Sequence, residues 1–169
     1  MILWISGPYG VGKSTLAEAL ATELDNAILF DAEEVGNAVR NSYPNDPYGY
    51  IFEDYPLWAE FCRKLLTDVH NSFHKNIIVP MTLVRAASYE AIIKSLMDSG
   101  IPVHFIILEA SYETIRGRIL DRGEEEDCWC IENIEMAREG SSALPGAVHI
   151  CTDGVSIESL KRTVLDLIL

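Results

Sequence analysis

Apolar residues occur in short uninterrupted runs that recur along the chain. Five such runs cover residues 1–6, 27–30, 77–81, 103–108 and 147–151, and most of their members are β-branched or aliphatic. They do not alternate with polar residues, which is typical of strands in a parallel sheet covered on both faces. The pattern therefore predicts five buried strands.

Apolar residues at helical spacing fill the intervals between these runs. The first helix is marked by Leu16, Leu20 and Leu24, a long second stripe by Leu57, Phe61, Leu65, Val69 and Phe73, and the last helix by Ile157, Leu160 and Val164. We expect the long stripe to face the core. Strands separated by helices imply right-handed crossovers and a doubly wound, three-layer α/β domain.

Two further helices are predicted from their boundary residues. Ser88 is expected to cap a helix that ends at Gly100, and Ser111 to cap one that ends before Gly123. Two segments, 41–55 and 123–127, interrupt the alternation. Long irregular segments of an α/β sheet usually lie at the ligand-binding edge.

Composition places the chain among ordinary globular domains. Its 169 residues predict a single domain over 1–169, and the net charge of −13 argues against nucleic acid and anionic membranes as partners. No apolar run approaches the roughly 20 residues of a membrane span. The first residues do not resemble a signal peptide, and four cysteines form no disulfide or zinc pattern, so we expect a cytoplasmic protein with reduced thiols.

A phosphate-binding motif carries the strongest chemical signal. Residues Gly7–Ser14 fit G-x-x-x-x-G-K-[ST], directly between a predicted strand and a predicted helix. Lys13 can reach the β and γ phosphates, and the Ser14 hydroxyl can bind Mg²⁺. We predict ATP binding, with Mg²⁺, through Gly7, Tyr9, Gly10, Val11, Gly12, Lys13, Ser14 and Thr15.

Asp31 follows the second strand, at the sheet edge where the γ-phosphate should lie. A carboxylate there can accept a proton from an acceptor hydroxyl or bind magnesium through water. The alternative is a helix N-cap. Glu33 and Glu34 come next and are interpreted as charges of the first helical turn.

Arg118 and Arg122 lie four residues apart and share a helix face. Paired arginines beside a charged loop suit a lid, over about 118–130, that stabilises the transferring phosphoryl group. The alternative is ion pairing with nearby glutamates and Asp121. Arg122 could instead stack on adenine.

Other candidates lie at the predicted strand ends. Thr82 and Arg85 follow the third strand and could contact an acceptor, and no magnesium-binding Asp stands there. Thr152 and Asp153 follow the fifth strand, where a loop could cradle adenine or only cap the last helix. Aromatic residues crowd 43–61, where they could stack on a base or sugar or pack on one another.

The motifs together resemble the tunicamycin-resistance ATP-binding proteins. The resemblance rests on MILWISGPYGVGKST, FDAEEVG, FEDYPLW, NIIVPMTLV, ETIRGRILDRGE and HICTDG. It implies a fold like that of shikimate kinase and chloramphenicol phosphotransferase: a five-stranded parallel sheet, strand order 2-3-1-4-5, with a lid. It also implies an acceptor region over about 31–62 and an acceptor site near Asp31, Glu34, Arg40, Asp54, Trp58 and Thr82. Arg85 stands at a position that is often acidic in relatives.

We therefore expect an Mg-ATP-dependent phosphotransferase that acts on a hydroxyl of a nucleoside-like or sugar-containing small molecule, as a monomer or homodimer. Lys13, Arg118 and Arg122 would neutralise the moving phosphoryl group, and Asp31 would orient or deprotonate the acceptor. The alternatives are a protein that sequesters an antibiotic without phosphoryl transfer, and a nucleoside monophosphate kinase.

Overall fold

Five parallel strands form one sheet in the order β2-β3-β1-β4-β5, as predicted. The computed structural model describes residues 1–169, and the strands are β1 (Ile2–Ser6), β2 (Ala27–Leu29), β3 (Asn76–Pro80), β4 (Val103–Glu109) and β5 (Val148–Cys151). Each lies within one residue of its predicted run at either end. The central strand β1 is completely buried, which explains why its sequence carries no polar alternation.

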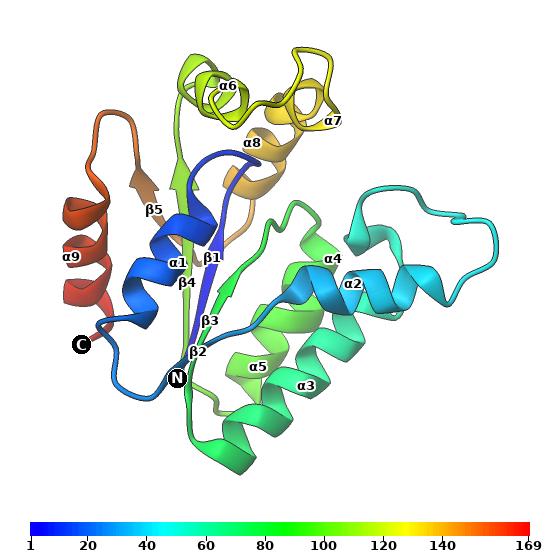
Figure 1. Ribbon diagram of the computed structural model, residues 1–169. Coiled ribbons are helices and arrows are strands. Elements are labelled where there is room, and N and C mark those ends of the chain that lie inside the picture. Colours follow the sequence, from blue (N-terminus) through cyan, green and yellow to red (C-terminus); the bar gives the residue numbers. More distant parts are fainter.

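Helices cover both faces of the sheet (Figure 1). On one side lie α1 (Lys13–Ala21) and α9 (Ile157–Ile168); on the other lie α2 (Ala32–Asn41), α3 (Trp58–Phe73), α4 (Ala86–Tyr89), the π-helical segment η2 (Glu90–Lys94) and α5 (Ser95–Asp98). At the carboxyl ends of the strands lie α6 (Tyr112–Leu120), α7 (Trp129–Glu132) and α8 (Ile134–Ser142). A short 3-10 helix, η1 (Phe52–Asp54), interrupts the loop after α2.

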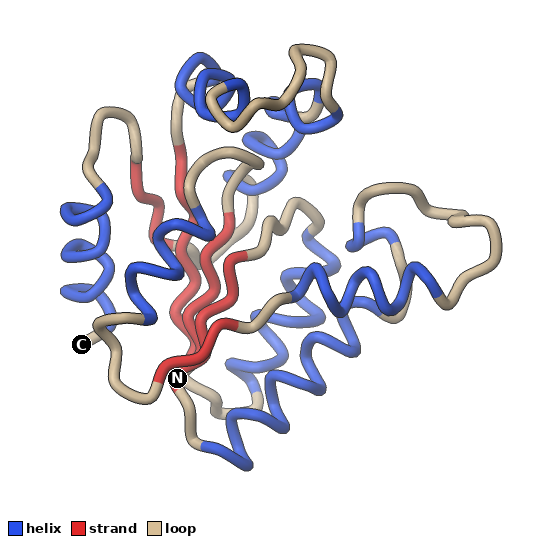
Figure 2. The backbone as a smooth tube through the Cα atoms, in the orientation of Figure 1, coloured by secondary structure: helices blue, strands red, loops and turns tan.

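The sheet divides the interior into two apolar layers. Ile2 and Trp4 of β1 pack with α2, α3 and the α4–α5 segment, whereas Leu3 and Ile5 pack with α1, α6 and α9. Neighbouring residues of a strand point to opposite faces, so β1 supplies both layers. The loops that follow the carboxyl ends of the strands lie outside these two layers, at the top of the view in Figure 2.

The face that α3 buries differs from the predicted one. Trp58, Cys62 and Leu66 are completely buried, whereas Leu57 and Phe61 of the predicted stripe are exposed by 40% and 42%. The sequence offers two apolar stripes, one residue apart and each with four-residue spacing. Packing against η2 and β3 decides which stripe is buried, and the spacing alone carries no information about that choice.

The helix predicted after Ser88 begins earlier, at Ala86. Arg85 stands at the N-cap position, no side chain caps the first turn, and Ser88 is buried inside the helix. The Glu53 carboxylate accepts hydrogen bonds from the backbone N–H groups of Val84 (2.8 Å) and Arg85 (3.0 Å), which lie directly before that turn. Ser111 does cap α6 as predicted, whereas the sequence pattern did not predict α8.

None of the helices is both long and apolar enough to span a membrane.

Candidate active site

The phosphate loop connects β1 to α1 at the carboxyl edge of the sheet. Gly7 and Gly10 have φ angles of +133° and +81°, which disfavour any side chain. A Cβ atom at Gly7 would lie 2.4 Å from the carbonyl oxygen of Leu108, so the loop also needs glycine for its close approach to β4. No side chain caps the start of α1, and the positive end of this helix is therefore open to an anion.

Lys13 opens α1 and turns back over the loop. Its Nζ donates hydrogen bonds to the carbonyls of Gly7 (3.0 Å) and Pro8 (2.9 Å). Burial lowers the pKa of Lys13 to about 8; the Glu33 carboxylate opposes this shift and the Arg122 guanidinium adds to it. The ammonium, a carboxylate and a second cation are thus close enough to influence one another.

These groups line one cavity of about 210 Å³ beside the phosphate loop. Its polar and reactive lining comes from Tyr9, Lys13, Ser14, Glu33, Arg122, Glu124 and Cys130. The loop, the first turn of α2 and the lid segment after α6 meet here, although they are far apart in the sequence. The arrangement puts two cations, a hydroxyl and carboxylates around one small volume, as phosphoryl transfer requires.

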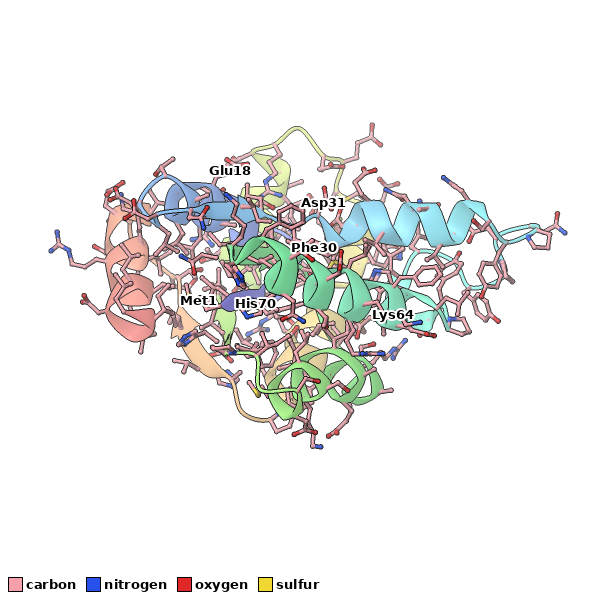
Figure 3. All side chains as sticks on the ribbon, turned by 90° about the horizontal axis from the view of Figure 1, so that it is seen from below. Met1, Glu18, Phe30, Asp31, Lys64 and His70 are labelled. Atoms are coloured by element: carbon pink, nitrogen blue, oxygen red, sulfur yellow. The ribbon has the colours of Figure 1, made fainter.

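Asp31 does not line this cavity, and its carboxylate caps a helix. Its Oδ1 accepts hydrogen bonds from the N–H groups of Glu33 (2.9 Å) and Glu34 (3.1 Å), so it caps α2. Figure 3 shows Asp31 at the amino end of α2, directly after Phe30. Glu33, interpreted from the sequence as only a first-turn charge, lines the cavity with Lys13. The cap that Asp31 supplies is what holds Glu33 in that place.

Arg118 joins the lid helix to two loops. Its guanidinium donates to the carbonyl of Val11, the hydroxyl of Thr152 and the carbonyl of Thr152, each at 3.0 Å. It lines a second cavity of about 300 Å³ with Thr15 and Arg122. Arg118 thus faces this second cavity, and Arg122 reaches both.

The loop after β5 is held by hydrogen bonds to α6. Asp153 accepts a hydrogen bond from the N–H of Ser111 (2.9 Å), and hydrogen bonds from Thr114 and Ser111 lower the pKa of its carboxyl group. Arg116 lines neither cavity and pairs with Glu126. The ion pairing considered for Arg118 is therefore made by Arg116.

Thr82 and Trp58 are both buried, and each donates a hydrogen bond to a backbone carbonyl. The Thr82 hydroxyl donates to the carbonyl of Gly7 (2.9 Å), which connects β3 to the phosphate loop. The Trp58 indole N–H donates to the carbonyl of Ala32 (2.9 Å), which holds α3 against the start of α2. Neither side chain lines the phosphate-loop cavity.

The other charged residues predicted for the acceptor site do not meet at one place. Arg85 forms an ion pair with Asp54 at 3.3 Å. Arg40 donates to Asn37 at 2.9 Å and lies 5.1 Å above the ring of Phe52. Glu34 faces a separate apolar groove between α2 and α3, with Leu57, Phe61 and Leu65.

The crowded aromatic residues divide into two groups. Tyr43, Tyr48 and Tyr55 contact one another edge to face, with ring centroids 5.1–5.7 Å apart, so this part of the loop packs on itself. The Trp129 ring contacts Tyr9 (centroids 4.9 Å apart) and Tyr50 (5.8 Å), and so connects α7 with the phosphate loop and the loop after α2. The roles of Glu53 and Trp129 could not be found from the sequence, because their partners are remote along the chain.

A protein-family model described as an AAA domain matches residues 2–130. The chain belongs to this family. No curated protein sequence matches it. Among solved structures, the tunicamycin resistance protein of Deinococcus radiodurans is similar, with a TM-score of 0.80, 24% identity and coverage of 98% of this chain and 94% of that one.

Two kinases show the same architecture at lower identity. A sugar kinase from Janibacter sp. HTCC2649 matches with a TM-score of 0.69 and 19% identity, covering 98% of this chain and 92% of that one. A gluconokinase from Sinorhizobium meliloti 1021 matches with a TM-score of 0.68 and 15% identity, covering 97% and 89%. The resemblance predicted from the motifs is therefore confirmed at the level of the fold, which is that of phosphate-loop kinases.

Proposed function

We propose that this protein transfers the γ-phosphoryl group of Mg-ATP to a hydroxyl of a nucleoside-like or sugar-containing small molecule. The observation that carries the proposal is the phosphate-loop cavity, which Lys13, Ser14, Arg122 and the Glu33 carboxylate line together. Cations and a carboxylate around one small volume suit an in-line displacement at phosphorus.

Each group has a role in this step. Lys13 and Arg122 neutralise the charge on the moving phosphoryl group, while Arg118 shapes the second cavity for the adenine base. The acceptor oxygen forms its bond to the γ-phosphorus as the bond to the β–γ bridging oxygen breaks, and ADP keeps that electron pair. The acceptor proton passes to a carboxylate, a role for which Glu33 is better placed than the predicted Asp31, because Glu33 lines the cavity with Lys13 and Asp31 does not.

The residues present fit a magnesium ion. The Ser14 hydroxyl and the carboxylates at the start of α2 supply the hard oxygen ligands that Mg²⁺ prefers, and Mg²⁺ commonly takes its other ligands from water and nucleotide phosphates. When bound, the ion would neutralise charge on the β and γ phosphates. Asp31 retains one carboxylate oxygen, Oδ2, outside the N-cap hydrogen bonds, and we assign it to a water of that ion.

Mass spectrometry tests the proposal directly. Tunicamycin, nucleosides and sugars are incubated with the protein and Mg-ATP, with the Lys13→Ala variant as a control. We expect one added phosphate on at least one compound with the wild-type protein and none with the variant. Tight binding of ATP and of tunicamycin without any modified product would overturn phosphoryl transfer and favour sequestration.

A further inference from the structure

The acceptor side of the phosphate-loop cavity is rich in carboxylates. Glu33 and Glu124 line the cavity. Burial raises the pKa of the Tyr9 phenol, the carboxylates of Glu53 and Glu33 raise it further, and the Arg85 guanidinium opposes them. Two acidic side chains thus line the space that Tyr9 and Lys13 also line.

The cations of the same region are already engaged. Arg85 is paired with Asp54, and Arg40 is held by Asn37 and by the ring of Phe52. Lys13 and Arg122 are the only cationic side chains that line the cavity, and the nucleotide phosphates require both. A negatively charged group on the acceptor would therefore find carboxylates in the cavity and no cation beyond the two that the nucleotide requires.

A backbone site that could hold an acceptor anion is occupied by the protein itself. The N–H groups of Val84 and Arg85 precede α4, at the carboxyl end of β3, and adjacent N–H groups of this kind bind anions. Both donate to the mostly buried carboxylate of Glu53, at 2.8 and 3.0 Å. Glu53 therefore takes the place of an external carboxylate, sulfate or phosphate.

We propose that the acceptor is an uncharged or positively charged hydroxyl compound and that Glu53 excludes anionic acceptors such as nucleoside monophosphates and sugar acids. The proposal rests on the proposed phosphotransferase function and deepens it. The proposal predicts that this protein acts on a different class of acceptor from a kinase of acidic sugars, although the two folds are alike. Specificity of this kind arises because like charges and an occupied anion site disfavour the wrong acceptor.

The first experiment measures anion binding and needs no acceptor. Inorganic sulfate is titrated by calorimetry into protein saturated with Mg²⁺ and a non-hydrolysable ATP analogue, which fills the phosphate loop. We expect no sulfate binding to the wild-type protein and binding to Glu53→Ser, in which the N–H groups of Val84 and Arg85 are free. Glu60→Ser, an exposed residue paired with Lys64, is the matched control and should gain nothing.

Sulfate binding to the wild-type protein would overturn the proposal, and so would a folded Glu53→Ser variant that gains none. If that variant does not fold, the wild-type titration still decides whether an anion site is open. The second experiment compares phosphorylation of glucosamine, glucose and gluconate, and of adenosine and AMP. Within each set we expect the anion to react at least about tenfold more slowly than its uncharged counterpart.

The two experiments separate this proposal from the proposed function. Faster transfer to gluconate or AMP would overturn the acceptor charge and leave phosphoryl transfer intact. If the wild-type protein binds no sulfate and phosphorylates none of the compounds, the exclusion of anions is supported. Only the proposed phosphoryl transfer is then contradicted.

Discussion

The hydroxyl of Thr82 donates a 2.9 Å hydrogen bond to the carbonyl of Gly7, the first residue of the phosphate loop. The same carbonyl accepts from Lys13 Nζ at 3.0 Å. A second bond joins the neighbouring residues: the N–H of Leu83 donates to the hydroxyl of Ser6 at 2.9 Å. The end of β3 thus orients the loop and, through it, the lysine that is to bind phosphate.

Replacing this hydroxyl should weaken the loop without changing its sequence. We expect Thr82→Val to lower the free energy of unfolding by about 1–2 kcal/mol, because a buried hydrogen bond is lost at nearly constant volume. ATP affinity should fall as well, since Gly7 loses one of its two anchors. Chemical denaturation and calorimetric titration measure the two effects.

Thr163→Val is the matched control for that variant. Thr163 is exposed, and its hydroxyl bonds only to its own helix, at Ser159. Its replacement should change stability by less than about 0.5 kcal/mol. Equal losses in the two variants would contradict a special role for the bond between Thr82 and Gly7.

The pKa of Lys13 predicts how ATP binding depends on pH. Burial lowers this pKa to about 8, so the ammonium of the free protein loses its proton as pH rises through 8. The negative phosphates should raise the pKa again, and ATP binding above pH 8 should therefore take up a proton and become weaker as pH rises.

Calorimetric titrations in buffers of different ionisation enthalpy measure this proton uptake. At pH 6.5 the lysine carries its proton in both states and should contribute none. Lys13→Met should abolish the uptake seen at higher pH. Uptake that persists in Lys13→Met would assign it to another group.

Isosteric variants can distinguish the roles of Asp31 and Glu33, the two carboxylates at the start of α2. We expect Glu33→Gln to lower turnover by about 10²–10⁴-fold, because it removes the proposed proton acceptor. Asp31→Asn should keep the fold and most of the turnover at saturating Mg²⁺, because Asn is also a good N-cap. Steady-state kinetics with the identified acceptor decide between them, and the opposite result would assign the proton to Asp31.

The contact between α2 and η1 depends on a glycine. A Cβ atom at Gly36 would lie 2.4 Å from the ring of Phe52. We expect Gly36→Ala to lower the free energy of unfolding by about 1–3 kcal/mol, because overpacking outweighs the better helix propensity of alanine. In Gly117→Ala nothing lies within 4 Å of the new atom, and thermal unfolding should show a small gain of stability. A stabilised Gly36→Ala would show that Phe52 moves freely.

Local patterns were sufficient for the strands and for the phosphate loop. Continuous apolar runs predicted the positions of all five strands, because strands covered on both faces carry few polar residues. The edge strands β2 and β5 are only partly buried, although their runs suggested full burial. The glycines at 7, 10 and 12 are required by backbone angles and close contacts, which are properties of the loop itself.

The buried face of α3 and the start of α4 could not be predicted in this way. Both depend on segments that lie far along the chain: α3 packs against η2 and β3, and the N–H groups directly before α4 are bound by Glu53. The Ser88 hydroxyl group was a good local candidate for a cap, but Ser88 lies inside the helix.

The sequence by itself determined the parallel α/β fold and the phosphate loop, since each follows from spacing within a few residues, whereas Arg122, predicted to share a helix face with Arg118, lies in the turn after α6. Only the tertiary structure decided that Arg118 anchors Thr152, that Glu33 faces Lys13 and that Glu53 fills the anion site. Charges separated by tens of residues become neighbours through folding, and their mutual fields, on which the proposed chemistry depends, exist only in the packed molecule.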